Sequence, residues 1–180
     1  MSDISFQPIG TVRTPYTDIS DMPIQSVAAR GVAGRIELLP DYLEGLADVE
    51  GFSHLWLIYH LHLVSPGGLT VTPFLDSRPH GIFATRSPRR PNAIGLSVVR
   101  LIGVDGSTLH IEDVDMLDGT PLLDIKPFVP AFDHRAAERI GWFEGNVERV
   151  SSVRADRRFG SQPPAQAGSP QGGTHEDQRS

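Results

Sequence analysis

The chain has 180 residues, of which 39% are hydrophobic and 21% charged, a composition that fits one globular domain and excludes a disordered or fibrous chain. The formal net charge of -6 excludes a generally basic coat for nucleic acid, because non-specific phosphate affinity comes from many Lys and Arg side chains, so any such contact must use a local patch. There is no cysteine, which excludes a disulfide framework, a thiolate zinc site and a cysteine nucleophile.

The first half of the chain predicts three strands, at residues 4–12, 31–38 and 52–64. Between the last two, Leu43, Leu46 and Val49 recur at helical spacing, so we expect one short helix within 39–52. The third strand, "FSHLWLIYHLHLV", is too apolar for an exposed position, which predicts a central strand ended by the turn "SPGG".

The second half predicts β-type segments at residues 69–75, 94–104, 107–117 and within 118–133, followed by one short helix within 134–145. Asp105 and Gly106 between two of these strands are typical of a β-hairpin. The spacing predicts an all-β sheet or barrel rather than alternating βαβ units, and neither a Rossmann glycine motif nor a P-loop is present.

The C-terminal residues are rich in Gly, Pro, Gln and Ser and cannot bury enough apolar area to offset the entropy lost on ordering. We therefore expect a folded domain over residues 1–152 and a disordered tail over 153–180. The N-terminus lacks a secretory signal pattern and no apolar run approaches the length of a membrane span, so we expect a cytoplasmic protein without a membrane anchor.

Three histidines, His54, His60 and His62, fall on alternate positions of the central strand and would share one face with Trp56 and Ile58. This spacing could present metal ligands, but carboxylates at ligand spacing are missing nearby. We expect no metal and favour a pocket lining at one end of the strand.

The stretch 77–104 contains no acidic residue but five arginines and one histidine: Arg78, Arg86, Arg89, Arg90, Arg100 and His80. It is either an anion site or a solvated loop whose charges are answered by acids elsewhere. Pro88 and Pro91 stiffen the loop, and Asn92 and Gly95 tolerate backbone geometry that lets a ligand approach, which favours the anion site.

Two acidic motifs follow. In "DMLDGTP", Asp115 and Asp118 precede a turn with exposed amides, and in "DIKP" Asp124 and Lys126 would share a strand face. The plain interpretation of the second pair is a surface salt bridge of little energetic value. The functional interpretation is that carboxylates and turn amides hold a ribose or adenine edge while Lys126 meets a phosphate or carboxylate.

Four ordered motifs, "FQPIGTVRTPY", "FSHLWLIYHLH", "FATRSPRRPNAIGLS" and "DGTPLLDIKPF", resemble the TsaA-like family, which includes the TrmO tRNA methyltransferases. The resemblance implies a mainly β, small single-domain β-barrel-like fold with one or two short helices, unrelated to the Rossmann methyltransferases. It also implies S-adenosyl-L-methionine as cofactor and a homodimer with the cofactor near the subunit interface. TrmO members methylate N6 of threonylcarbamoyl-adenosine beside the anticodon of tRNA.

The resemblance implies a cofactor pocket formed by Gln25, Ser26, Val27, His62, Leu63, Arg86, Leu96, Asp118, Gly119, Thr120 and Pro121. Arg86 would orient the cofactor or the threonyl carboxylate, and Arg89, Arg90 and Lys126 would contact tRNA. Methyl transfer from a sulfonium is an in-line displacement that needs alignment rather than a covalent nucleophile. Asp118 and His62 are the candidates for any base, with Lys126 a third candidate for a catalytic role.

Two positions depart from the family pattern, because Ala93 stands where a proline is common and Phe128 where a tyrosine is common. Ala93 makes the loop slightly less restrained, and Phe128 removes one hydroxyl donor near Lys126. The long C-terminal extension of some bacterial TrmO proteins is replaced here by a short helix-like segment and the tail, which predicts a tRNA-binding surface that is smaller or differently built. Two alternatives stay open: a methyltransferase acting on another small or nucleic-acid acceptor, and a non-catalytic module that binds S-adenosylmethionine or RNA.

Overall fold

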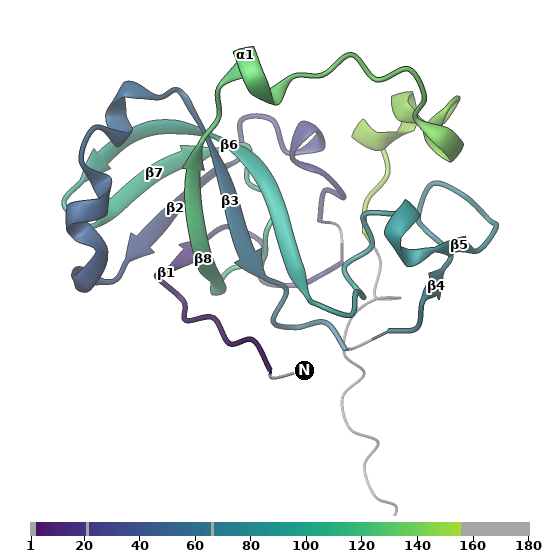
Figure 1. Ribbon diagram of the computed structural model, residues 1–180, viewed down its shortest axis with the longest axis horizontal. Helices are drawn as coiled ribbons and strands as arrows, with labels where there is room; N and C mark the ends of the chain where they lie inside the picture. The colour runs from purple at the N-terminus through teal and green to yellow at the C-terminus, as the bar shows by residue number, and fades with distance from the viewer. Residues whose placement is uncertain (1–2, 21, 66, 156–180) are drawn as a thin grey trace, which may run out of the picture.

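The computed structural model describes residues 3–20, 22–65 and 67–155, and its centre is a closed, fully antiparallel barrel. Around the barrel the strands follow the order β1 (Gly10–Arg13), β2 (Ala33–Leu38), β7 (Thr108–Glu112), β6 (Ile94–Asp105), β3 (His54–His60) and β8 (Thr120–Pro127). The expected mainly β, barrel-like, non-Rossmann fold is confirmed (Figure 1).

Alternation of buried and exposed residues along the strands fills the barrel. In β3 the side chains of Leu55, Leu57 and Tyr59 are buried, while the residues between them face outward. The core continues through Val12, Ile36, Val99, Leu101, Leu109, Ile111 and Leu122 from the other strands. β1 begins at Gly10 and β3 ends at His60, so both strands are shorter than the patterns 4–12 and 52–64 predict.

The helical segments differ most from expectation. The helix expected within 39–52 is two 3₁₀ segments, η2 (Pro40–Leu46) and η3 (Val49–Gly51), interrupted at Asp48, whose φ of 64° is left-handed. The helix expected within 134–145 is wrong: the one α-helix of the described residues is α1 (Pro130–Asp133), and only the 3₁₀ turn η5 (Gly141–Phe143) lies in that range.

Outside the barrel lies a small two-stranded sheet, formed by β4 (Thr70–Val71) and β5 (His80–Gly81). The expected strand 69–75 shrinks to two residues because Pro73 has no amide to donate to a sheet. The Asp105-Gly106 hairpin is confirmed: it joins β6 to β7, and Gly106 has a φ of 56°.

Four 3₁₀ turns complete the fold, η1 (Ser26–Ala28), η4 (Ile82–Ala84), η5 and η6 (Val147–Ser151). In Figure 1, the segment carrying η5 and η6 lies near the β4–β5 sheet, to one side of the barrel. Two backbone contacts fix its end, because the Ala155 amide donates to the Met22 carbonyl at 2.8 Å and Arg154 forms a β-bridge with Pro23.

These contacts involve the first residues of the tail expected over 153–180, whereas residues 156–180 lie outside the described part of the chain. Within the described ranges, no helix has the length and apolar character needed to cross a bilayer.

Candidate functional site

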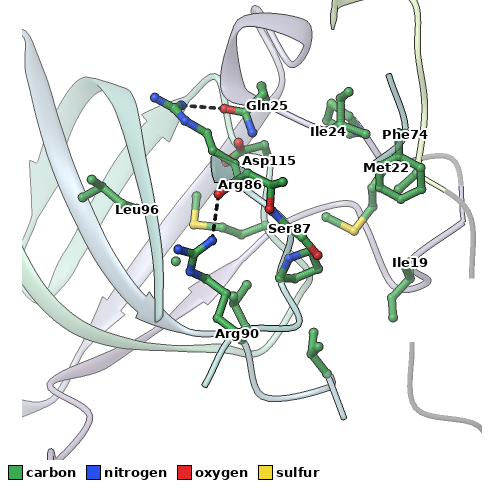
Figure 2. Close-up of a pocket in the computed structure, with 18 of the residues that line it drawn as sticks. Ile19, Met22, Ile24, Gln25, Phe74, Arg86, Ser87, Arg90, Leu96 and Asp115 are labelled. Carbon is green, nitrogen blue, oxygen red and sulfur yellow. Dashed lines mark hydrogen bonds between the residues drawn. The ribbon is translucent and has the colours of Figure 1, made fainter. Parts of the chain in front are cut away.

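One pocket of about 430 Å³ lies between the barrel and the segments beside it (Figure 2). It is lined by residues 22–25, 61–64, 73–75, 85–88, 94–96, 115–117 and 142–143, together with Ile19, Trp56, Tyr59, Arg90, Thr120, Val150 and Ala155. The arginine-rich loop, the end of β3 and the start of β6 therefore meet at one cavity, although they are far apart in sequence. The residues just after the end of the central strand, Leu61 to Val64, line this pocket.

A chain of three hydrogen-bonding side chains runs from the barrel interior to this pocket. Tyr59 Oη lies 3.0 Å from Ser97 Oγ, and Ser97 Oγ donates to Asp115 Oδ1 at 2.7 Å. Because Ser97 has a single proton and gives it to the carboxylate, Tyr59 is the donor to Ser97. Tyr59 and Ser97 are 7% and 4% exposed, so the two side chains that support Asp115 are both buried.

The carboxyl of Asp115 is partly buried at the pocket wall, and this desolvation raises its pKa to about 6. The hydrogen bond from Ser97, backbone amides and the positive charge of Arg86 act in the opposite direction and favour the charged form. Burial likewise raises the pKa of Tyr59, with the Asp115 charge as the second cause, so the phenol stays protonated. The pocket therefore contains a carboxyl group whose charged form is disfavoured by desolvation.

The three arginines of the loop divide into one exposed and two partly buried side chains. Arg86 is exposed and donates from Nη1 to Gln25 Oε1 at 2.7 Å, beside Asp115 (Figure 2). Arg90 donates from Nη1 to the carbonyls of Thr85 at 2.8 Å and Ile82 at 3.3 Å, which ties the loop to itself. Arg89 packs against Gly67, where an added Cβ would lie 2.8 Å from Arg89 Cβ.

The remaining cations of the acid-free stretch are answered by acids outside it. Arg78 and His80 both lie near Asp76, with His80 Nε2 3.0 Å from Asp76 Oδ2, and Arg100 lies 3.5 Å from Glu112. The charges of these residues are therefore balanced by acids outside the stretch, whereas Arg86 lines the pocket and donates to Gln25.

Apolar side chains form the opposite part of the pocket. Met22, Ile24 and Phe74 gather there in Figure 2, away from Arg86 and Asp115. Trp142 adds to this wall and is held by three contacts: its Nε1 donates to the Ala84 carbonyl at 2.7 Å, and its ring stacks on His80 and Phe143. The pocket thus combines a charged side with an apolar side.

Of the histidines within residues 3–155 that the structure describes, His62 alone lines the pocket, just beyond the end of β3. Burial lowers the pKa of His62, a backbone hydrogen bond with His60 opposes this, and the charge of His60 lowers the pKa further. The net effect favours the neutral imidazole, which can accept a proton. His54 shares the outward face with Trp56 and Ile58, as predicted. The described residues contain no group of three or more His, Asp and Glu side chains placed to hold a metal ion.

The "DGTP" motif contributes less to the pocket than the resemblance implies. Thr120 lines it, but Asp118, Gly119 and Pro121 do not. Asp118 Oδ1 instead accepts from the Thr14 amide at 3.1 Å, and Gly119 has a φ of 78° and donates to the Val12 carbonyl at 3.0 Å. In a single subunit the motif therefore ties the start of β8 to the end of β1.

Six of the expected cofactor residues line the pocket: Gln25, His62, Leu63, Arg86, Leu96 and Thr120. Ser26 and Val27 do not line it, but they follow Gln25 in the chain, at the start of η1. Lys126 lies elsewhere, on β8 opposite Trp56, and its Nζ is 2.7 Å from Asp124 Oδ2, which confirms the predicted ion pair. Phe128 packs edge-on against the rings of His54, Trp56 and His134, a role for which no hydroxyl is needed.

The cofactor set predicted from sequence omits several residues that build the site. Tyr59, Ser97 and Asp115 lie in the motifs "FSHLWLIYHLH", "FATRSPRRPNAIGLS" and "DMLDGTP". The alternation along the two strands could have placed Tyr59 and Ser97 on the inner face. Trp142 carries no comparable signal, because its position at the pocket depends on a long-range contact with Ala84.

The family of the tRNA-methyltransferase O N-terminal domain matches residues 11–134, which include the barrel strands and most of the pocket. The chain belongs to this family. The recognition of a TrmO-like chain from its four motifs is therefore confirmed.

Relatives of the TrmO family extend the match. A Pyrococcus abyssi protein named probable S-adenosyl-L-methionine-binding protein is 52% identical over 156 residues, covering 87% of this chain and 85% of that protein. The tRNA (adenine(37)-N6)-methyltransferase of Escherichia coli is 37% identical, covering 72% of this chain and 60% of the enzyme. A crystal structure of TrmO from Pseudomonas aeruginosa superposes with a TM-score of 0.65 and 39% identity, covering 78% of this chain and 63% of that one. The chain thus spans about three-fifths of the length of these two bacterial proteins.

Proposed function

We propose that this protein is an S-adenosylmethionine-dependent methyltransferase that methylates N6 of threonylcarbamoyl-adenosine next to the anticodon of tRNA. The observation that carries the proposal is a pocket on a TrmO barrel with a partly buried carboxylate and a guanidinium on one side and apolar side chains on the other. The names of the Escherichia coli and Pyrococcus abyssi relatives support the reaction and the cofactor, respectively.

The residues present fit such a cofactor, which has a nucleoside, a positively charged sulfonium centre and a charged amino-acid arm. The volume of about 430 Å³ is that of a small-molecule site. Ser87 Oγ is buried at the pocket wall and has no hydrogen-bond partner within the described residues, which leaves a hydroxyl for a bound molecule. Gln25, His62, Leu63, Arg86, Leu96 and Thr120 would contact the cofactor.

S-adenosylmethionine supplies an electrophilic methyl group on its sulfonium sulfur. The chain's own contribution is alignment of donor and acceptor and removal of the N6 proton. His62 is the better placed base of the predicted candidates, because it is neutral and lines the pocket, whereas Asp118 is bonded to the Thr14 amide outside the lining. The threonylcarbamoyl group makes the N6 proton more acidic, which lowers the demand on this base.

A homodimer with the cofactor near the subunit interface is part of the proposal. Leu63 and Leu96 line the pocket and are 44% and 57% exposed, and neighbouring Val27 is 61% exposed. Covering this apolar rim with a second copy would bury it and could bring in the "DGTP" turn, which does not line the pocket of a single subunit. The proposed substrate places the protein in the cytoplasm, in agreement with the absence of cysteine.

Of the three cations predicted to contact tRNA, Lys126 is exposed and lies 2.7 Å from Asp124, and Arg89 is partly buried. Arg90 donates to two carbonyls of its own loop. The experiment incubates the protein with S-adenosylmethionine and tRNA isolated with or without the threonylcarbamoyl group, followed by mass spectrometry of nucleosides. We expect N6 methylation only of the tRNA that carries the group. Equal methylation of both would indicate another acceptor, and cofactor binding without turnover on the modified tRNA would indicate a binding module.

A further inference from the structure

Residues 67–93 form a positively charged lobe on an acidic protein. This basic lobe contains four arginines but one acid, Asp76, so its formal charge is +3, whereas the whole chain carries -6. The carboxylate of Asp76 is already engaged, because its Oδ2 lies 3.0 Å from His80 Nε2 and 3.7 Å from Arg78 Nη2. The β4–β5 sheet of the lobe lies outside the barrel (Figure 1). The lobe therefore presents positive charge to an anionic partner, although the chain as a whole would repel one.

Two large apolar side chains are exposed on the basic lobe. Leu69 is 65% exposed and Phe83 is 77% exposed. The two residues lie on paired segments, because the Ile82 amide donates to the Leu69 carbonyl at 2.9 Å. The side chain of Arg78, on the same lobe, is 79% exposed. An exposed aromatic ring on a basic surface is typical of proteins that bind single-stranded nucleic acid, in which rings stack on bases and cations contact phosphates.

The 3₁₀ turn η4, which carries Phe83, is held in place from its inner side. Ile82 is 1% exposed, and its carbonyl accepts a hydrogen bond from Arg90 Nη1 at 3.3 Å. The carbonyl of Ala84 accepts from Trp142 Nε1 at 2.7 Å. These bonds fix the backbone on both sides of Phe83 and leave its ring in solvent. Because the ring is positioned before a partner arrives, less conformational entropy is lost on binding.

We propose that the basic lobe binds the single-stranded loop of the tRNA beside the target adenosine, with Phe83 stacked on an unpaired base and Arg78 against the phosphate backbone. The proposal rests on the proposed function and adds to it the surface that receives the flanking nucleotides. The lobe leads directly into the pocket, since Thr85 and Arg86 both line it. RNA loops are recognised in this way, by unstacked bases that pack on aromatic side chains.

The test measures tRNA binding by fluorescence anisotropy at several salt concentrations, using the full chain without a methyl donor. For Phe83→Ala we expect the affinity to fall roughly 5- to 100-fold with an unchanged salt slope, because stacking releases no counterions. Phe83→Tyr keeps the ring and should retain the affinity. Arg78→Ala should reduce the slope of log affinity against log salt by about one unit. Phe132→Ala, which removes another exposed phenylalanine on α1, is the matched control and should bind tRNA normally.

Photocrosslinking tests the position of the contact. An anticodon stem–loop RNA with 5-iodouridine in place of a nucleotide that flanks the target adenosine should crosslink, on irradiation, to the peptide that contains Phe83. Peptide mass spectrometry identifies the site. Crosslinks confined to peptides outside residues 67–93 would contradict the proposal.

The other outcomes separate this proposal from the proposed function. Unchanged tRNA affinity of Phe83→Ala would overturn the stacking role, as would a loss of affinity that accompanies a changed oligomeric state in sedimentation, which would make the lobe a contact between subunits. Phe83-dependent binding to phosphatidylserine vesicles with unchanged tRNA affinity would assign the lobe to a membrane surface. Loss of S-adenosylmethionine binding by Phe83→Ala would show a structural role instead. If the unmodified protein binds no tRNA, the proposed function itself is wrong.

Discussion

The Tyr59 ring lies directly against Gly95, its antiparallel partner on β6. A Cβ atom at position 95 would overlap Cε2 and Cζ of this ring, so the observed ring position requires glycine at position 95. The ring position lets Tyr59 Oη reach Ser97, which holds the carboxylate of Asp115. The glycine thus makes room for a protein side chain that supports the pocket, rather than for a ligand.

Gly95→Ala should destabilise the protein by about 1–3 kcal/mol, because the Tyr59 ring must move out of a packed barrel. Urea denaturation measures the change. Gly103→Ala is the control on the same strand, since no atom lies within 4 Å of a Cβ there, and it should change the free energy of unfolding by less than about 0.5 kcal/mol. Equal effects of the two substitutions would show that the ring does not depend on Gly95.

Asp115→Asn should stabilise the fold at high pH. The folded-state pKa of Asp115 is about 6, above its ordinary value, so the folded protein binds more protons and is favoured at acid pH. This contribution is complete below about pH 4 and is lost as the pH rises through about 6. The variant should therefore exceed the unmodified protein by about 1–3 kcal/mol at pH 8, and the gap should close near pH 4.

Urea denaturation at several pH values tests this expectation, with Asp105→Asn as the exposed control whose difference from the unmodified protein stays constant. A partly buried acid that lowers stability at neutral pH is typical of a functional position. A variant that is less stable at pH 8 than at pH 4, each relative to the unmodified protein, would contradict the raised pKa.

Arg90→Ala should cost about 1–3 kcal/mol of stability, because its guanidinium bonds the Thr85 and Ile82 carbonyls of the loop. Arg86→Ala should change the free energy of unfolding by less than about 1 kcal/mol, since its side chain is exposed. Thermal and urea unfolding of both variants test the distinction. A stable Arg90→Ala with weaker tRNA binding would return Arg90 to the predicted phosphate role.

Trp142→Phe should loosen the segment 141–155 from the pocket, because it removes the bond from Nε1 to the Ala84 carbonyl at 2.7 Å while keeping an aromatic ring. We expect a loss of about 0.5–1.5 kcal/mol and faster cleavage of this segment in limited proteolysis. Phe143→Leu, which removes only one stacked ring, serves as comparison. Unchanged proteolysis of both variants would show that other contacts hold the segment.

Lys126 is the only lysine of the chain, so amine-directed acylation reports on it selectively beside the N-terminal amine. If Lys126 contacts a tRNA phosphate, tRNA should protect it, and Lys126→Ala should reduce the slope of log affinity against log salt by about one unit. Peptide mass spectrometry measures the protection. Full acylation of Lys126 in the presence of saturating tRNA would remove it from the tRNA surface.

Local patterns predicted the barrel because each strand alternates between core and surface, as β3 does through Leu55, Leu57 and Tyr59. The helix at 134–145 was wrong because local composition cannot show that Gly141 and Gly145 adopt left-handed φ angles of 59° and 77°. The site was predictable to the same extent. Arg86 could be picked out from its local motif, whereas Trp142 is placed at the pocket by tertiary contacts that the sequence does not show.

Asp118 and Asp115 show why a motif alone does not place a side chain. The two acids are three residues apart in "DMLDGTP", yet Asp115 faces the pocket and Asp118 turns to the Thr14 amide. The left-handed turn at Gly119 follows directly after Asp118, and a sequence pattern does not specify which of the two carboxylates it leaves at the pocket.

Nucleoside mass spectrometry of tRNA from cells lacking the gene tests the central claim most directly, with complementation by the unmodified protein and by Arg86→Ala. The account predicts loss of N6-methylated threonylcarbamoyl-adenosine, accumulation of its unmethylated form, restoration by the unmodified protein and weak or no restoration by Arg86→Ala. An unchanged content of the methylated nucleoside in the deletion strain would contradict the proposed function.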